Sequence, residues 1–172
     1  MRDVLGMSHD PYQAFLARKR IADPATGMAS VPALPGFLKP HQRDIASWAL
    51  RRGRSAVFAG TGLGKTLIEL IWASEVARYT GKPVLGFAPL AVSAQHIREA
   101  ERFGIDAAIA RAQDDVRSGV IITNYQKIDH FDLASFGGVV LDESSILKST
   151  DGHYRNRLIS ECAQVPFRLA AT

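Results

Sequence analysis

The sequence has few of the features that mark secreted, membrane-spanning or disulfide-stabilised proteins. Its 172 residues include a single cysteine, Cys162, so no disulfide can form within the chain. No window reaches the roughly 18 consecutive apolar residues of a membrane-spanning helix, and the N-terminus lacks the apolar core of a signal peptide. These absences predict a cytoplasmic protein in which Cys162 is a core or neutral surface residue.

The excess of positive over negative charge is also modest. The chain has 21 lysines and arginines against 17 aspartates and glutamates, a formal net charge of +4. An excess of this size is compatible with a polyanionic partner but does not require one. The arginine-rich runs at residues 17–20 and 51–54 are more typical of solvated helix ends than of phosphate contacts. Since 47% of the residues are hydrophobic, the length fits one domain with a sizeable core.

The chain divides into an N-terminal segment and a domain. Asp10 followed by Pro11 predicts a helix over residues 10–21, because aspartate caps helix starts and proline favours the first helical position. Residues 22–36 are rich in proline, glycine and small side chains, which indicates a loop or linker. We therefore expect residues 1–36 to form an N-terminal helical and linker segment, and residues 37–172 to form the domain.

Strand and helix patterns alternate along that domain. A helix is predicted from Pro40 to a cap at Gly53, with Ile45, Trp48 and Ala49 on one face. Apolar runs predict strands over residues 55–59, 83–88, 106–110, 119–125, 137–143 and 167–171. Helices are predicted from the glycine-rich loop to about residue 79, over residues 92–103 and over residues 151–162. Continuous apolar strands alternating with helices predict an α/β fold with a mostly parallel sheet and helices on both faces.

A glycine-rich loop follows the first predicted strand. It comprises Gly60, Thr61, Gly62, Leu63, Gly64, Lys65 and Thr66. Glycines let backbone N–H groups point at phosphate oxygens, and the following helix adds the positive end of its dipole. In such a loop the lysine neutralises the β- and γ-phosphates and the threonine hydroxyl binds Mg²⁺. Ala59 stands where these loops usually begin with glycine, and we interpret it as the last strand residue.

Two carboxylates, Asp142 and Glu143, end another apolar strand. Ligands of parallel α/β sheets bind at the carboxyl ends of the strands, where the glycine-rich loop is also expected. A Mg²⁺ ion beside a triphosphate needs a carboxylate, and an adjacent carboxylate can orient and deprotonate the attacking water. Loop and carboxylates together predict a nucleotide site with ATP and Mg²⁺, and Lys65, Asp142 and Glu143 as its catalytic residues.

Five segments in a fixed order resemble the first RecA-like domain of superfamily-two helicases. The resemblance is closer to their Swi/Snf-like branch of DEAD/DEAH-type proteins, especially helicase-like proteins of phages and prophages. "LKPHQ" (residues 38–42) is similar to the Q motif, "AGTGLGKT" (59–66) to motif I and "APLAVSAQHIREAERFG" (88–104) to motif Ia. "ITNYQ" (122–126) is similar to motif Ib and "LDESS" (141–145) to motif II.

This resemblance implies a RecA-like P-loop NTPase fold and a role for each matching residue. Gln42, whose amide both donates and accepts as the adenine edge requires, would read the base. The glycine-rich loop would hold the phosphates, Thr66 and Asp142 would bind Mg²⁺, and Glu143 would activate water. Contacts with a DNA backbone are implied for Pro89, Leu90, Ser93, Gln95, Thr123, Asn124 and Tyr125. Helix capping and turn formation would account for the polar members of this set equally well.

The resemblance also implies a partner domain. In this family ATP lies between two RecA-like domains, and the second supplies arginines that stabilise the charge on the γ-phosphate. The chain has no second phosphate loop, and Thr172 matches the first residue of motif III. We therefore expect a fragment of a two-domain motor. By itself it should bind ATP or ADP weakly and hydrolyse ATP very slowly.

Other functions stay open at this point. The same loop and carboxylates occur in ring-forming ATPases and small-molecule kinases, although Gln42 favours the helicase reading. The chain could also be a non-catalytic nucleic-acid-binding or regulatory module, or part of the motor subunit of a restriction enzyme. The choice between DNA and RNA, and between unwinding and translocation along a duplex, is not encoded in these motifs.

Overall fold

The computed structural model describes residues 24–60, 62–144 and 152–172. The predicted helix over residues 10–21, and Thr61 of the glycine-rich loop, lie outside the described residues. Within them, none of the helices combines the length and hydropathy of a membrane span. A cytoplasmic location stays a prediction.

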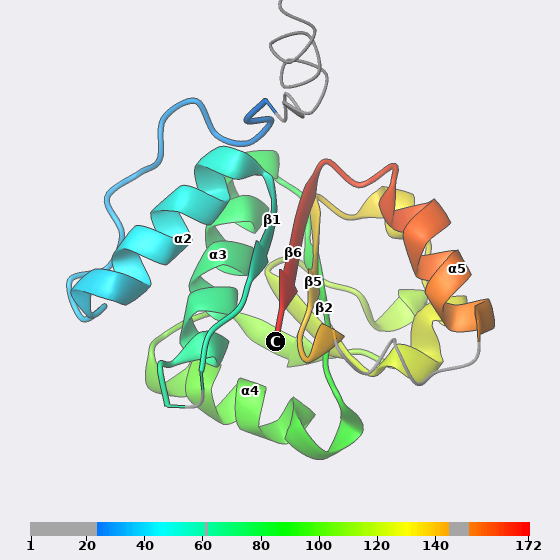
Figure 1. Cartoon of the computed structure of the whole chain (residues 1–172). Coiled ribbons are helices and arrows are strands. Elements are labelled where there is room, and N and C mark those ends of the chain that lie inside the picture. Colours follow the sequence, from blue (N-terminus) through cyan, green and yellow to red (C-terminus); the bar gives the residue numbers. More distant parts are fainter. Residues whose placement is uncertain (1–23, 61, 145–151) are drawn as a thin grey trace, which may run out of the picture.

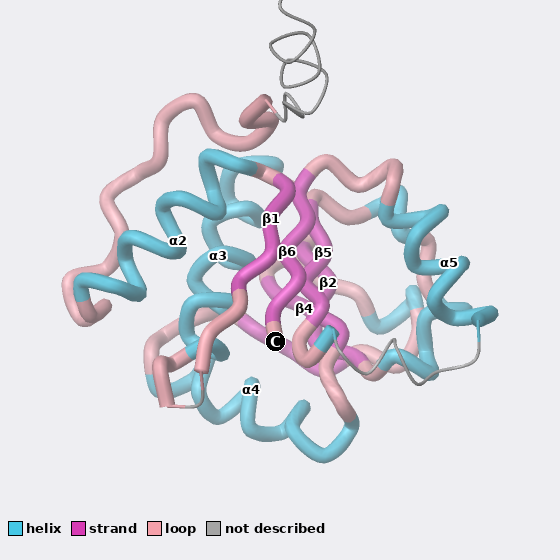
Figure 2. Tube along the Cα trace, viewed as in Figure 1, coloured by secondary structure: helices cyan, strands magenta, loops and turns pink. Residues whose placement is uncertain are grey.

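A six-stranded sheet forms the centre of the molecule, in the order β1-β6-β5-β2-β4-β3, and each neighbouring pair is parallel (Figures 1 and 2). The strands are β1 Arg54–Val57, β2 Val84–Phe87, β3 Ala107–Ile109, β4 Val120–Thr123, β5 Gly138–Leu141 and β6 Phe167–Ala171. Every residue of β2 and β4 is buried, as expected for central strands covered on both faces. The predicted α/β fold with a parallel sheet is confirmed.

Helices cover both faces of this sheet (Figure 1). Helices α2 Pro40–Arg52, α3 Lys65–Thr80 and α4 Leu90–Arg102 pack on one face. Helix α5 Gly152–Cys162 lies on the other, with the short 3₁₀ helices η2 Tyr125–His130 and η3 Leu133–Ser135. A further 3₁₀ turn, η1, spans Gln113–Asp115. The helix predicted from residue 92 begins two residues earlier, at Leu90, because Pro89 provides its N-cap.

Glycines end two of the predicted helices. The α2 cap, Gly53, has φ 74°, and the α3 cap, Gly81, has φ 66°, conformations that side-chain-bearing residues rarely adopt. Trp48 was expected on the buried face of α2, but it is 46% exposed, whereas Ala49 is fully buried. The indole therefore lies at the margin of the packed face.

Residues 24–36 pack against the domain. The backbone N–H groups of Thr26, Gly27 and Met28 donate to the carbonyls of Arg52, Arg51 and Leu50 at the end of α2. A Cβ at Gly27 would lie 2.0 Å from the Leu50 carbonyl oxygen, so this close approach requires glycine. Met28 is 2% exposed and belongs to the core beneath α3. The domain boundary at residue 37 stays a prediction, but this part of the segment covers the core.

Candidate nucleotide-binding site

The glycine-rich loop connects β1 to α3, as predicted. Ala59, however, is not the last strand residue: the β1–β6 pairing ends at Val57. The Ala59 N–H still donates to the Thr172 carbonyl at 3.1 Å, which keeps the loop alongside the end of β6. Gly62 has φ 83°, and Gly64, the N-cap of α3, has φ 76°. The loop therefore takes a left-handed conformation at two glycines before the helix begins.

Gln42 reaches from α2 to this loop. Its Nε2 donates to the Leu63 carbonyl at 3.2 Å, and its Oε1 accepts from the Lys39 N–H at 3.0 Å. The side chain is buried, and a Cβ at Gly64 would lie 2.1 Å from the Gln42 Nε2. Gln42 thus braces the glycine-rich loop against the start of α2. These contacts use one N–H and one lone pair of an amide that has two of each. Its role as an adenine reader stays a prediction.

Lys65 meets both carboxylates of the "LDESS" segment. Its Nζ lies 3.4 Å from Asp142 Oδ1 and 3.4 Å from Glu143 Oε2. Lys65 and Glu143 are 78 residues apart in sequence, and they meet because β5 and β1 are separated only by β6 in the sheet. The structure therefore brings the three predicted catalytic residues together at the carboxyl ends of the strands.

The two carboxylates differ in their surroundings. The Asp142 side chain is 9% exposed, whereas that of Glu143 is 46% exposed. Glu143 has φ 53°. Among the residues that the structure describes, it is the only non-glycine residue with a positive φ. Left-handed backbone at such a residue costs about 1 to 3 kcal/mol and is concentrated at functional sites. Glu143 Oε1 also accepts from the Thr172 hydroxyl at 3.0 Å.

Charges in the site shift one another's pKa. Burial by itself would lower the pKa of Lys65, but the carboxylates of Asp142, Glu69 and Glu143 raise it above its ordinary value. Burial would raise the pKa of Asp142, yet His96 and Lys65 hold it below its ordinary range. Lys65 is therefore a cation and Asp142 an anion at neutral pH, as phosphate and Mg²⁺ binding require.

Two charged residues that the motifs did not indicate complete the site. His96 of α4 places its Nε2 3.3 Å from Asp142 Oδ2 and 3.5 Å from Oε2 of Glu69, a residue of α3. The side chains of His96 and Glu69 are each only 4% exposed. The one sequence signal was Glu69 itself, the single charge in the otherwise apolar run from Leu67 to Ala73.

The protonation of this cluster follows from its geometry. His96 Nδ1 donates to the Val92 carbonyl at 3.1 Å, so Nε2 faces the two carboxylates. Burial would lower the pKa of His96, but Asp142 and Glu69 raise it to about 10. Burial raises the pKa of Glu69 to about 7, with His96 and Lys65 opposing the shift. His96 is thus a buried imidazolium between two acids.

The residues predicted to contact nucleic acid fall into two groups. Leu90 is 72% exposed, Gln95 is exposed, and Pro89 is half-buried at the start of α4. Ser93 is buried, and its hydroxyl donates to the Pro89 carbonyl at 3.3 Å. This is a back-bond within α4 and not a cap, because Pro89 occupies the N-cap position of the helix.

The remaining three predicted contacts follow β4. Thr123 is 2% and Tyr125 6% exposed, and Asn124 is half-buried as the N-cap of η2. The Tyr125 hydroxyl donates to the Asp142 carbonyl at 2.7 Å, and its ring stacks on Phe87 at 5.6 Å between centroids. Tyr125 therefore supports the backbone of the carboxylate strand. Nucleic-acid contact by these seven residues stays a prediction.

The residues present fit a nucleotide with Mg²⁺. A helix whose N-cap is glycine presents its first N–H groups to an anion without competition from a capping side chain. Asp142 Oδ1 is buried without a hydrogen bond among the described residues, although Lys65 lies within ion-pair distance of it. Carboxylate and hydroxyl oxygens are preferred Mg²⁺ ligands. Thr66, half-buried in the first turn of α3, offers the hydroxyl.

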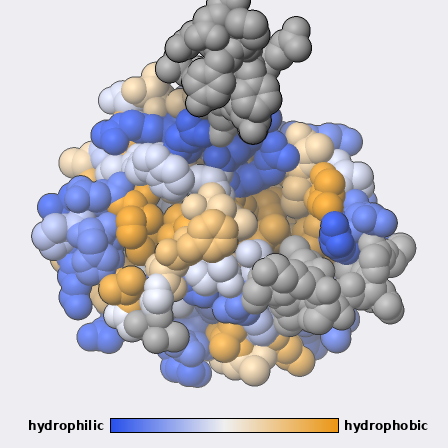
Figure 3. Space-filling view, in the orientation of Figure 1, coloured by the Kyte–Doolittle hydropathy of each residue, from blue (hydrophilic) through white to orange (hydrophobic). Residues whose placement is uncertain are grey.

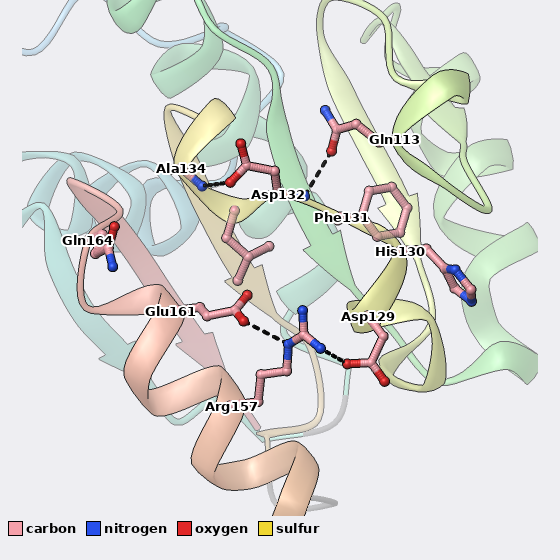
Figure 4. Close-up of a pocket in the computed structure, with 10 residues that line it drawn as sticks. Gln113, Asp129, His130, Phe131, Asp132, Ala134, Arg157, Glu161 and Gln164 are labelled. Carbon is pink, nitrogen blue, oxygen red and sulfur yellow. Dashed lines mark hydrogen bonds and ion pairs between the residues drawn. The ribbon is translucent and has the colours of Figure 1, made fainter.

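A second hollow lies elsewhere, between α5 and the η2 and η3 segments (Figure 4). It is an open groove of about 550 Å³. Arg157, on its wall, pairs with Asp129 and with Glu161, whose Oε1 lies 2.7 Å from the Arg157 Nε. These charges satisfy one another at the rim. The groove is far larger than the cavity of about 10 Å³ beside Asp142. The charged side chains that come together with little solvent exposure, however, lie around Asp142.

Comparison with protein-family models and with curated protein sequences gives no match. Solved structures, in contrast, share the fold. The UvsW helicase of bacteriophage T4 superposes with a TM-score of 0.63 at 16% identity, over 93% of this chain and 59% of that one. The SWI2/SNF2 ATPase core of Sulfolobus solfataricus, solved in complex with double-stranded DNA, gives a TM-score of 0.65 at 19% identity.

A hypothetical ATP-dependent RNA helicase of Sulfolobus tokodaii gives a TM-score of 0.60 at 16% identity and matches 80% of this chain. The chain spans 59%, 34% and 47% of the three chains in turn. At these identities the likeness establishes the fold: a six-stranded parallel α/β domain of the kind found in RecA-like helicase and Swi2/Snf2 ATPase cores.

Proposed function

We propose that the chain is the ATP-binding domain of a DNA-dependent ATPase of the helicase or translocase type. The observation that carries this proposal is the meeting of Lys65, at the start of α3, with Asp142 and Glu143, beyond β5, at 3.4 Å in each case. An ammonium group next to paired carboxylates, beside a glycine-capped helix start, suits Mg²⁺-bound triphosphate and few other ligands.

Each residue contributes one part of the proposed chemistry. Lys65 and the loop from Gly60 to Thr66 bind the phosphates, and Gln42, already bonded to the Leu63 carbonyl, reads adenine. Thr66 and Asp142 hold Mg²⁺, which when bound neutralises charge on the phosphates. Glu143, the more exposed carboxylate, orients water and accepts its proton.

The proposal includes a second RecA-like domain. Phe58, just before the glycine-rich loop, is 80% exposed, and Leu63, within the loop, is 44% exposed. Hydrophobic surface is open in the middle of the face that carries β1 and the C-terminus (Figure 3). A docked domain would cover such side chains and supply the arginines that stabilise charge on the γ-phosphate. Without it, we expect weak nucleotide binding and very slow hydrolysis.

A direct test is a calorimetric titration of the chain with ADP and with ATP in the presence of Mg²⁺. Lys65→Ala should weaken binding by about 10- to 100-fold, because a charge-assisted hydrogen bond contributes about 1.5 to 3 kcal/mol. Arg157→Ala, in the groove on the far face, is the matched control and should bind normally. Equal affinity of wild type and Lys65→Ala would refute the nucleotide site.

The nucleic-acid partner is tested separately. We expect sequence-independent binding to DNA that weakens as salt rises, since backbone contacts release counterions. Leu90→Asp, at the exposed start of α4, should weaken that binding while leaving ADP affinity unchanged. Competition between duplex DNA, single-stranded DNA and RNA of equal length would identify the preferred partner. DNA binding without any nucleotide binding would instead support a non-catalytic DNA-binding module.

A further inference from the structure

Asp142 lies between two cations of different kinds. Lys65 approaches its Oδ1 at 3.4 Å from the phosphate loop, and His96 approaches its Oδ2 at 3.3 Å from α4. The Lys65 side chain is 21% exposed, whereas that of His96 is 4% exposed. Incoming phosphates would compete for the lysine, but they have no access to the histidine. Of the two, only His96 can stay on Asp142 when a nucleotide binds.

The ring of His96 is held by one hydrogen bond, and its other nitrogen faces two carboxylates. Its Nδ1 donates to the Val92 carbonyl one turn earlier in α4 at 3.1 Å. Its Nε2 lies between Asp142 and Glu69, and a ring nitrogen and one oxygen of each carboxylate lie within 4.8 Å of one another. Nε2 lies within ion-pair distance of both carboxylates but forms no hydrogen bond of good geometry among the described residues. A hydrogen on Nε2 would let the ring donate to either one, since ionised carboxylates only accept. Glu69, fixed on the phosphate-loop helix α3, thereby ties the ring to the same helix that presents Lys65.

We propose that His96 is a positioning residue: it holds Oδ2 of Asp142 and so aims Oδ1 at the Mg²⁺ of the bound nucleotide, while Glu69 holds the ring. This inference rests on the proposed function, since it concerns the same Mg²⁺ site. It gives a role to two residues, His96 and Glu69, to which the resemblance assigned none. Partners that orient a metal ligand typically change metal affinity by about 10- to 100-fold when removed.

A metal ion in place of the imidazolium proton is the competing arrangement. An imidazole nitrogen and two carboxylate oxygens are suitable ligands for Zn²⁺. The surroundings argue against a metal ion, however, because the ammonium group of Lys65 already lies 3.4 Å from Asp142 Oδ1. The cavity beside these residues measures about 10 Å³ and is otherwise lined by residues such as Leu70, Phe87 and Val140.

The experiment measures how much Mg²⁺ strengthens ADP binding. The dissociation constant is determined in EDTA and in excess Mg²⁺ for the full chain, for His96→Gln and for Glu69→Gln. We expect wild-type binding to tighten with Mg²⁺, and His96→Gln to lose at least about 10-fold of that gain while its affinity in EDTA is unchanged. Glu69→Gln should lose a smaller part of it. Lys65→Ala should instead lose affinity in both conditions.

Leu158→Ala is the control for a general loss of stability, because it removes buried contacts on the far face of the sheet. It should lower the melting temperature but keep the full Mg²⁺ gain. If the wild type shows the Mg²⁺ gain and both His96→Gln and Glu69→Gln retain it, the positioning role is wrong while the nucleotide site stands. If the wild type does not bind ADP at all, the proposed function itself fails. One tightly bound Zn²⁺ per chain, lost in His96→Gln, would overturn the imidazolium assignment.

Discussion

The face of the sheet covered by α2, α3 and α4 buries Glu69, Glu75 and His96, whereas the α5 face buries almost entirely apolar side chains. On the α5 face, the charged residues Arg157, Asp129 and Glu161 stay at the rim, with 30%, 40% and 33% of their side chains exposed. Both faces nevertheless have similar apolar cores, built from the same strands.

This difference suggests that the α5 face contributes to stability alone, whereas the α2–α4 face also serves the proposed function. Burying an ion costs several kcal/mol unless a partner compensates it, so packing alone gives no reason to bury Glu69 and His96 together. The α5 face shows that this sheet can be covered without buried ions. On the other face, Glu69 and His96 converge on Asp142, beside the glycine-rich loop, which is where the proposed chemistry requires them, whereas Glu75 pairs with Arg78.

The largest effect on stability should come from the α5 face. Leu158 is 2% exposed, and Leu158→Ala should lower the free energy of unfolding by about 2 to 5 kcal/mol, because it leaves a cavity in the core. Urea denaturation measures this loss. ADP affinity of the folded fraction should not change. A parallel loss of ADP affinity would show that the two faces are not separable.

A smaller effect is expected in the phosphate loop. Gly64→Ala should cost about 1 to 3 kcal/mol, because residue 64 has a left-handed backbone. The new methyl group would also lie 2.1 Å from the Gln42 Nε2, so ADP binding should weaken. Gly36→Ala is the control, since nothing lies within 4 Å of its added Cβ. Equal stability of the two variants would contradict the loop geometry.

The buried imidazolium predicts a pH dependence on the α2–α4 face. Contacts with Asp142 and Glu69 raise the pKa of His96 from 6.5 to about 10. The stabilisation is therefore fully present below pH 6.5 and is lost as pH rises through 10. The pKa of Glu69 is raised from 4.5 to about 7, so its own contribution to stability declines over that lower interval and precedes most of the decline due to His96.

Urea denaturation at intervals from pH 6.5 to 10 measures this decline. In His96→Gln the free energy of unfolding should fall less steeply over that range than in the wild type. Arg157→Ala should retain the wild-type slope. A wild-type curve that stays flat, or a steeper curve for His96→Gln, would contradict the charge state inferred for the ring.

The smallest effect belongs to the rim of the α5 face. Arg157→Ala removes ion pairs with Asp129 and Glu161, and it should cost less than about 1 kcal/mol, because exposed ion pairs contribute little. Thermal denaturation at low and high salt would measure it, with the difference between variants shrinking as salt rises. A loss as large as that of Leu158→Ala would show that this rim contributes to the core.

Much of the fold followed from local patterns. The helix from Pro40 ends at the predicted glycine, Gly53, and the last strand has the predicted bounds, residues 167–171. Strand ends were less accurate. The strand expected through Tyr125 stops at Thr123, because a 3₁₀ helix with Asn124 at its N-cap position turns Tyr125 back toward Asp142. The Asn124 side chain makes no capping hydrogen bond, so the turn follows from the backbone and from the contact of Tyr125 with Asp142, neither of which the apolar pattern registers.

The site was predictable only where its residues follow one another in the chain. The loop ending in Lys65 and Thr66, and the pair Asp142 and Glu143, are short segments whose chemistry is apparent without any neighbour. Glu69 is marked only as a single charge in an apolar run, and His96 lies within the segment similar to motif Ia without an assigned role. A glutamate in a helix and a histidine in the next one become a pair only once α3 and α4 lie side by side on the sheet.

The sequence by itself therefore determined the order of strands and helices, the parallel α/β class, and the chemical groups available to a nucleotide. These properties depend on side-chain periodicity and on turn residues, which act over a few positions. Only the tertiary structure decided that Lys65 and His96 share the oxygens of Asp142, that Gln42 braces the loop, and that Thr123 and Tyr125 are buried. Those contacts depend on the strand order β1-β6-β5-β2-β4-β3, which joins segments far apart in the chain through packing that no local pattern encodes.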